Sequence, residues 1–221
     1  MKDTKTRILD AAERLIMALG AEKASLRKIT DEAGVNVAAI NYHFGSKNNM
    51  ISAIMERFLA PLSTELHQSL DRVYAGADNG KPELEAVIRA YLVPLLDFSL
   101  RYPDHQTFFM QMYGYIDDKN VFMQSIRGLV EKDIKYYAGA LLAALPDLPE
   151  QTVLLRLAFF RNTAFGIMQG DCIMEESMGV LGLDLDREEM IEEMVVSVAA
   201  GFRADVKDKS STILEEDTHE S

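Results

Sequence analysis

Cysteine is almost absent from this 221-residue chain, which has one, at position 172. A single thiol cannot form a disulfide within the chain, so we expect a reducing compartment, the cytoplasm. The first residues, from Met1 to Lys5, lead into an amphipathic pattern without the apolar core of a signal peptide. No uninterrupted apolar run reaches the ~20 residues that a membrane-spanning helix requires. The sequence therefore predicts a soluble, cytoplasmic protein.

Sequence motifs of common enzymes are missing as well. There is no Walker loop, no glycine-rich dinucleotide fingerprint and no HExxH zinc motif. The four histidines are scattered without the spacing of metal ligands: His43, His67, His105 and His219. We therefore expect no enzymatic activity, no cofactor and no metal site. The alternative of a helical enzyme stays open, because sequence does not give the spatial neighbours of Cys172, and a turnover assay on a bound metabolite would decide it.

Positive charge is scarce overall and unevenly distributed. The chain has 23 Lys and Arg against 35 Asp and Glu, a formal charge of −12. Residues 1–50 carry a net charge of +2, so the remainder carries −14. An acidic body repels the phosphate backbone of nucleic acid, so any contact with nucleic acid is expected at the N-terminal end.

Apolar residues recur at helical spacing, and nothing alternates like a β-strand for long, so the predicted fold is all-α. Three short helices are expected within residues 1–47, followed by a fourth from about Lys47 to Leu70, kinked at Pro61. Asp186 and Glu189 have the spacing of a helix capping box. Further helices are expected at about 82–101, 104–117, 119–145, 149–171 and 187–205, with a break at Ser177–Asp186. The predicted units are residues 1–47, residues 48–206 and an acidic tail at residues 207–221 that is expected to be disordered.

The most informative segment runs from Ser25 to Lys47, SLRKITDEAGVNVAAINYHFGSK. Ser25 can cap a first short helix, and a glycine turn at Gly34 separates it from a second. In the second helix, Ile40 and Phe44 form an i, i+4 pair that can turn inward. This pattern predicts a helix-turn-helix whose second helix faces DNA.

The run INYHFGSK, from Ile40 to Lys47, resembles the signature of the TetR family of bacterial transcriptional regulators. The resemblance covers roughly the first fifth of the chain and includes the turn, the helix phase and the trailing lysine. It implies an N-terminal three-helix DNA-binding domain followed by a larger helical domain that binds a small molecule and dimerises. One departure is Asn41, where many relatives have tyrosine, so details of base preference are not carried across.

The resemblance and the expected helix phase give a DNA-facing set: Arg27, Lys28, Asn36, Val37, Ala38, Ala39, Asn41, Tyr42, His43 and Lys47. Arg27 can donate two hydrogen bonds to a guanine, and Asn41 can form two hydrogen bonds with an adenine. Small apolar side chains can contact thymine methyl groups. Tyr42 and Lys47 can hold phosphates and so set the register. His43 is equally well explained as a cap or a packing residue, and Lys28 as part of a solvated face.

The rest of the chain is rich in methionine and aromatic residues, which suit an adaptable apolar cavity. Taken one at a time, each such residue is better explained by core packing, and each arginine by ion pairing or by a surface position with a buried stem. INYHFGSK, the loop at 145–149 and AAGFRAD at Ala199–Asp205 resemble the branch of the family that senses fatty acids and regulates their breakdown. That resemblance implies a long-chain fatty acid or acyl-CoA as effector. Its candidate contacts are Arg89, Phe108, Phe109, Met112, Tyr113, Arg161 and Phe165, with Arg156 as a further candidate cation.

A homodimer is expected through the helices at about 149–171 and 187–205, because two-fold symmetry pairs two DNA-reading modules with a palindromic operator. Repression is the usual mode of the family. Helix four would carry the effector signal as a lever, because it begins beside the DNA-reading helix and continues into the body. A DNA-binding protein without any effector is the remaining alternative, and the absence of a ligand-induced thermal shift would favour it.

Overall fold

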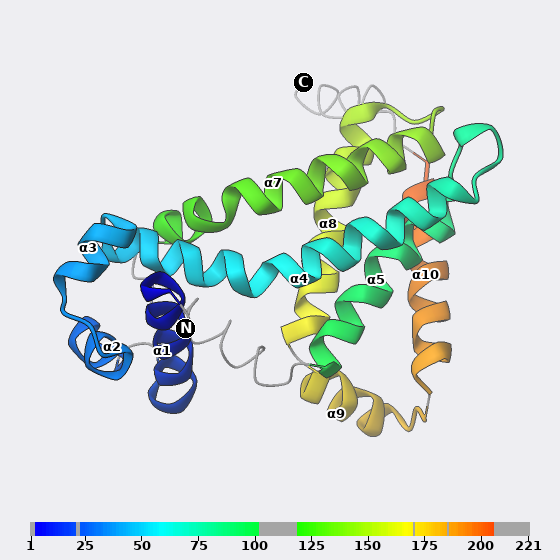
Figure 1. Cartoon of the computed structure of the whole chain (residues 1–221). Helices are drawn as coiled ribbons and strands as arrows, with labels where there is room; N and C mark the ends of the chain where they lie inside the picture. The colour runs from blue at the N-terminus through cyan, green and yellow to red at the C-terminus, as the bar shows by residue number, and fades with distance from the viewer. Residues whose placement is uncertain (1–2, 21–22, 102–118, 170, 185, 206–221) are drawn as a thin grey trace, which may run out of the picture.

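The computed structural model describes residues 3–20, 23–101, 119–169, 171–184 and 186–205. Within these ranges every regular element is a helix and no strand occurs, which confirms the all-α prediction. Figure 1 shows a small group of helices, α1 to α3, at one end of the molecule, with the long α4 running from them into the remaining helices. In the described part of the chain, no helix combines the length and the apolar character needed to cross a membrane.

The N-terminal unit consists of three helices: α1 (Thr4–Leu19), α2 (Leu26–Ala33) and α3 (Ala38–Phe44). Asp3 and Ser25 cap α1 and α2, because the side chain of each accepts a backbone N–H three residues later. Apolar side chains at helical spacing in the three helices are buried, among them Ile8, Ala12, Ile16, Ile29, Ala33, Ile40 and Phe44, whereas Leu19 at the end of α1 is exposed.

The longest helix is α4 (Lys47–Ala75), which begins at the predicted residue. Pro61 lies inside it on the exposed side, and the helix continues on both sides of the proline. An apolar stripe at helical spacing is buried along most of its length: Met50, Ile54, Phe58, Leu62, Leu66 and Leu70. One helix therefore contributes both to the core of the N-terminal unit and to the core of the body.

The body contains five further α-helices in the described ranges: α5 (Leu84–Arg101), α7 (Lys119–Ala144), α8 (Glu150–Gln169), α9 (Asp171–Leu181) and α10 (Arg187–Arg203). The capping box of Asp186 and Glu189 is present at the start of α10, as predicted. The expected break at Ser177–Asp186 is wrong in its first half, because α9 occupies this stretch up to Leu181. The predicted helix at 104–117 and the predicted tail at 207–221 lie outside the described residues.

A buried tyrosine joins α7 to two other helices. The Tyr137 side chain is 1% exposed, and its hydroxyl lies 2.8 Å from the carbonyl oxygen of Ala90 in α5 and 3.0 Å from that of Leu66 in α4. Pro94 follows Ala90 by four residues and has no N–H to donate back to it. The Tyr137 hydroxyl can therefore donate to the carbonyl that the proline leaves without its helical partner.

Candidate nucleic-acid interface

The turn between α2 and α3 depends on Gly34. Its φ of 63° and ψ of 41° lie in the left-handed region, and its N–H donates to the carbonyl of Asp31 at 3.1 Å. The Arg7 guanidinium donates to the carbonyls of Ala33 and Gly34, so α1 closes the C-terminal end of α2. A Cβ atom at Gly34 would lie 2.9 Å from Nη2 of Arg7. Both the backbone conformation and the available space therefore favour glycine at this position.

Asn36 has a structural role at the start of α3. Its Oδ1 accepts the backbone N–H of Ala39 at 3.1 Å, which satisfies one of the free donors in the first turn. Asn36 is exposed, as its predicted place on the DNA-facing side requires. The same side chain therefore fixes where the second helix of the motif begins.

The two faces of α3 differ sharply in exposure. Ile40 is 1% exposed and Phe44 8%, so both turn inward as predicted. On the outer side, Val37 is 46% and Tyr42 86% exposed. Ala38 and Asn41 are also exposed, whereas Ala39 is half-buried. The outer face therefore offers an amide, a phenol and small apolar groups, the side-chain types that contact base edges and phosphates.

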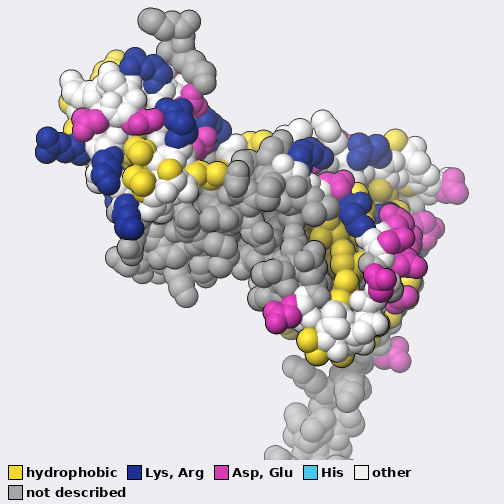
Figure 2. Space-filling view, turned by 90° about the horizontal axis from the view of Figure 1, so that it is seen from below, with side chains coloured by type: hydrophobic (Ala, Val, Ile, Leu, Met, Phe, Trp, Pro, Cys, Tyr) yellow, Lys and Arg dark blue, Asp and Glu magenta, His cyan; other side chains and the backbone are white. Residues whose placement is uncertain are grey.

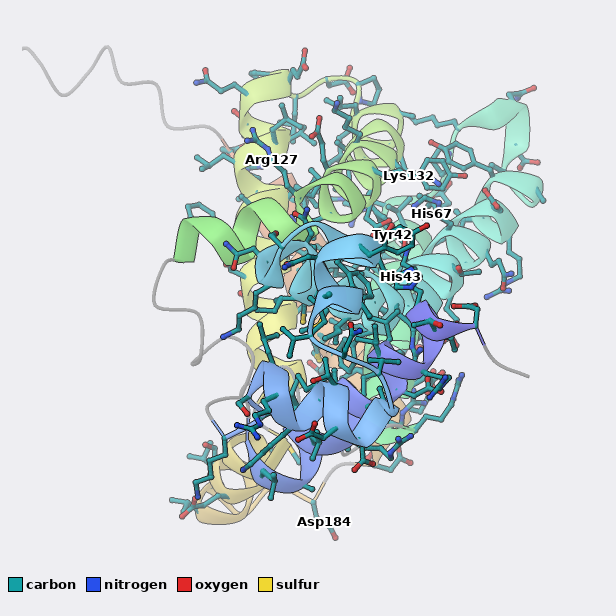
Figure 3. All side chains as sticks on the ribbon, turned by 60° about the vertical axis from the view of Figure 1, so that its left-hand side comes forward. Tyr42, His43, His67, Arg127, Lys132 and Asp184 are labelled. Carbon is teal, nitrogen blue, oxygen red and sulfur yellow. The ribbon has the colours of Figure 1, made fainter. Side chains whose placement is uncertain are left out.

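Tyr42 and His43 lie next to each other at the end of this face, as Figure 3 shows. Their rings meet edge to face, with centroids 5.0 Å apart. His43 is half-buried, and Tyr42 projects into solvent. His43 is therefore partly enclosed by the protein, whereas Tyr42 is open to solvent.

The junction of α3 and α4 is held by a side chain that the sequence patterns did not single out. Ser46 accepts the N–H of Asn49 at 3.1 Å, and Nδ2 of Asn49 donates to the carbonyl of Phe44 at 2.8 Å. A polar residue three positions after a capping serine is the available sequence signal. Lys47, the first residue of α4, is half-buried and lies at the positive end of the helix dipole.

The charge distribution supports this end of the molecule as the anion-binding one. Arg27 and Lys28 are exposed in the first turn of α2, and Nζ of Lys5 lies 5.8 Å from the ring centre of Phe44. Figure 2 shows Lys and Arg side chains over the α1–α3 end, with some Asp and Glu among them, and a denser group of Asp and Glu side chains at the opposite end. On this face the acidic side chains are therefore concentrated away from the α1–α3 end.

Two of the arginines considered as effector contacts have different surroundings. Nη1 of Arg89 lies 2.9 Å from Oε1 of Glu188, and its Nη2 pairs with Glu192. Arg161 is half-buried and contacts a neutral group, the hydroxyl of Tyr91, 3.3 Å from its Nε. Within the described part of the chain, no carboxylate is within salt-bridge distance of Arg161. The charge of Arg89 is therefore matched by two carboxylates, whereas Arg161 has no such partner among the described residues.

The third arginine, Arg156, closes the end of α10. Its guanidinium donates to the carbonyls of Phe202 at 2.7 Å and Ala204 at 2.6 Å, which are acceptors of the last helical turn. Of the five apolar residues predicted as effector contacts, four lie outside the described residues and only the backbone of the fifth is described: Phe108, Phe109, Met112, Tyr113 and Phe165.

Two family models match the chain. Residues 8–54 match a model described as "Bacterial regulatory proteins, tetR family". Residues 89–201, about half of the chain, match a model described as "Tetracyclin repressor-like, C-terminal domain". The first match contains the helix-turn-helix and the start of α4, and the second contains most of the body.

Characterised relatives match over shorter stretches. The nicotine-responsive transcriptional repressor HdnoR of Paenarthrobacter nicotinovorans is 35% identical over 77 residues, which are 35% of this chain and 38% of the relative. The regulator BetI of Vibrio campbellii is 32% identical over 73 residues, 33% of this chain and 37% of the relative. The chain thus spans well under two thirds of the length of the relatives it matches.

Solved structures match over nearly the whole chain at low identity. A TetR-like transcriptional regulator from Rhodococcus sp. RHA1 has a TM-score of 0.58 and 15% identity, over 91% of this chain and 97% of that one. The multidrug binding protein EbrR, complexed with imidazole, has a TM-score of 0.57 and 15% identity, over 90% of this chain and 96% of that one. At such identities the likeness concerns the fold.

Proposed function

The chain belongs to the tetR family of bacterial regulatory proteins, and from this premise we propose that it is a transcriptional regulator that binds a palindromic operator as a homodimer. The observation that carries the proposal is the outer face of α3, which is presented between two glycine turns and backed by Ile40 and Phe44. Residues 1–47 would bind DNA, and residues 48–206 would bind an effector and form the dimer. Repression is the mode we propose.

The exposed groups of the interface suggest a division of labour. Arg27 and Asn41 would read bases, because a guanidinium can bind guanine and an amide can bind adenine through two hydrogen bonds each. Val37 and Ala38 would contact thymine methyl groups, with Ala39 beside them. Tyr42 and Lys47 would hold phosphates, with Lys28 adding charge, and Asn36 and His43 would support the reading face.

We expect Lys47→Ala to weaken binding to all DNA sequences alike and to reduce the salt dependence by about one unit per half-site. Asn41→Ala should instead cost about 1–3 kcal/mol and relax the preference at particular bases. Selection from random DNA followed by salt-dependent binding measurements compares the two. If Lys47→Ala changed base preference and Asn41→Ala did not, the proposed docking of α3 would be wrong.

Homodimer formation is supported by α8 and α10. Apolar side chains on α8 are left exposed: Leu154 at 39%, Leu155 at 55% and Phe159 at 63%. On α10, which contacts α8, Val196 is 60% exposed, and the small Ala200 and Gly201 are exposed one turn later. Small and apolar groups on adjacent helices allow close packing against a second copy. A dimer would place two α3 helices on half-sites ~35 Å apart.

An effector with an apolar chain and an acidic end is supported by Arg161. This half-buried guanidinium lies beside a cluster of buried aromatic rings from three helices: Tyr91, Tyr137 and Phe160. A partly desolvated cation that has no carboxylate partner among the described side chains favours an anionic ligand group. We therefore propose a long-chain fatty acid or acyl-CoA, with Arg161 in contact with its carboxylate or thioester end.

We expect Arg161→Met to lower the affinity for a long-chain fatty acid by about 10- to 100-fold, because a hydrogen bond to a charged group contributes about 1.5–3 kcal/mol. Calorimetry compares the binding of a fatty acid and of its methyl ester to the wild type and to Arg161→Met. The variant should lose affinity for the acid and keep its affinity for the ester. Arg89→Met is the matched control, because Glu188 and Glu192 already neutralise Arg89.

The regulatory part of the proposal has its own test. If the effector releases DNA, operator DNA must weaken effector binding by the same factor, since the coupling is reciprocal. A screen of fatty acids and acyl thioesters, repeated with bound operator, measures this factor. Equal affinities with and without operator would rule out this switch, and a protein that binds DNA but no acyl compound would be a regulator of another kind.

A further inference from the structure

A group of three charged side chains joins α1 to α4 beside the apolar core. Nη2 of Arg57 on α4 lies 2.6 Å from Oδ1 of Asp10 and 2.6 Å from Oε2 of Glu13. Asp10 and Glu13 are three residues apart on α1 and therefore share one face of that helix. One guanidinium nitrogen thus bridges two carboxylates of a different helix, more than 40 residues away in the chain.

The group is shielded enough to hold its geometry. The Asp10 side chain is 15% exposed, that of Glu13 29% and that of Arg57 36%. Burial raises the pKa of the Glu13 carboxyl, although the hydrogen bond from Arg57 opposes this shift. A second ion pair in the same unit, Arg14 with Glu32, is far more open, with side chains 60% and 42% exposed. Solvent screens that second pair much more strongly.

Position along α4 determines what this contact can control. Arg57 lies between two buried residues of α4, Met55 two positions earlier and Phe58 directly after it. The ring of Phe58 packs edge to face on Phe98 of α5. The contact therefore lies where α4 passes from the N-terminal unit to the body. Apolar packing around this contact is non-directional. The two hydrogen bonds that Nη2 of Arg57 donates to Asp10 and Glu13 are directional, and they limit rotation of α1 about α4. Through Arg7, α1 also holds the turn before α3.

From this geometry we infer that Arg57, held by Asp10 and Glu13, is a positioning residue that sets the orientation of the α1–α3 unit on α4 and hence the half-site spacing that the dimer accepts. The inference rests on the proposed function as an operator-binding dimer. Successive base pairs are ~3.4 Å apart along DNA, so a tilt that shifts α3 by this distance changes the accepted spacing by one base pair. Arg57 touches no DNA in this scheme and acts only through orientation.

The test uses the full-length protein and an operator selected from random DNA by the wild type. Operators lengthened or shortened by one and two base pairs at the centre are then compared with the selected one. We expect the wild type to prefer the selected spacing by about tenfold or more, since a mismatched spacing prevents both modules from binding together. Arg57→Met keeps the apolar stem and should reduce this preference to about threefold or less, with affinity for an isolated half-site unchanged.

Controls separate the possible outcomes. Arg14→Met removes the exposed pair with Glu32 and should retain the wild-type spacing preference. Glu13→Gln keeps the shape and the acceptor oxygen but removes one charge, and an intermediate preference is expected; this variant decides the matter if Arg57→Met fails to fold. An unchanged spacing preference in folded Arg57→Met, or in Glu13→Gln in its place, overturns the inference while leaving operator binding intact. Failure of the wild type to select any DNA would instead overturn the proposed function.

Discussion

Replacement of Val196 by glutamate is expected to convert the protein to a monomer at micromolar concentration and to lower its affinity for a palindromic operator by about 100-fold or more. Val196 is 60% exposed on α10 within the proposed dimer surface. A carboxylate there would have to be buried without a partner, which costs far more than the contacts of a valine contribute. The loss in DNA affinity follows because each module would then bind its half-site independently.

Val180 provides the matched control for this experiment. It is 82% exposed on α9, outside the α8 and α10 surface, so Val180→Glu makes the same chemical change at a more exposed valine. Sedimentation and operator binding should both resemble the wild type for this variant. A dimeric Val196→Glu, or a monomeric Val180→Glu, would move the interface away from α10.

Much of the fold could be predicted because its signals are local. The apolar stripe of α4 from Met50 to Leu70 follows helical spacing, and the capping residues lie within a few positions of the helix starts they stabilise. Helix α9 is not among the predicted helices, and its second half falls in the expected break for a physical reason. Gly179 lies inside the helix, where a glycine costs only about 1 kcal/mol, whereas Gly182 adopts a φ of 69° just beyond its end.

In the candidate site, too, some features could be predicted from local sequence and others could not. The outer face of α3 could be predicted, because the phase of Ile40 and Phe44 determines which neighbours point outward. The role of Arg57 could not, since it depends on Asp10, which only tertiary packing brings near. Arg161 was a candidate effector contact together with Arg89, but only the structure distinguishes the two, because it shows which of them has carboxylate partners. The pattern of charged and apolar residues along the sequence does not show which residues far apart in the chain come into contact.

The same dependence on tertiary packing underlies the expected effect of Tyr137→Phe, which should lower the free energy of unfolding by about 1–3 kcal/mol, the cost of a buried polar group left without its partner. The ring would remain, so packing is preserved, but the Ala90 carbonyl would lose the hydroxyl 2.8 Å away. Urea unfolding of the full chain measures the change. Tyr136→Phe is the matched control, because its hydroxyl bonds to Asp71 in an exposed position and its loss should cost much less.

A double-mutant cycle with Pro94→Ala tests the reason for that cost. Alanine at position 94 supplies the backbone N–H that proline lacks, so α5 could satisfy the Ala90 carbonyl by itself. In the Pro94→Ala background, Tyr137→Phe should then cost clearly less than in the wild type, a non-additivity of about 1 kcal/mol or more between contacting groups. Additive effects would mean that Tyr137 stabilises the body through its 3.0 Å contact with Leu66 or through packing alone. In that case the proline and the tyrosine would be independent features of the core.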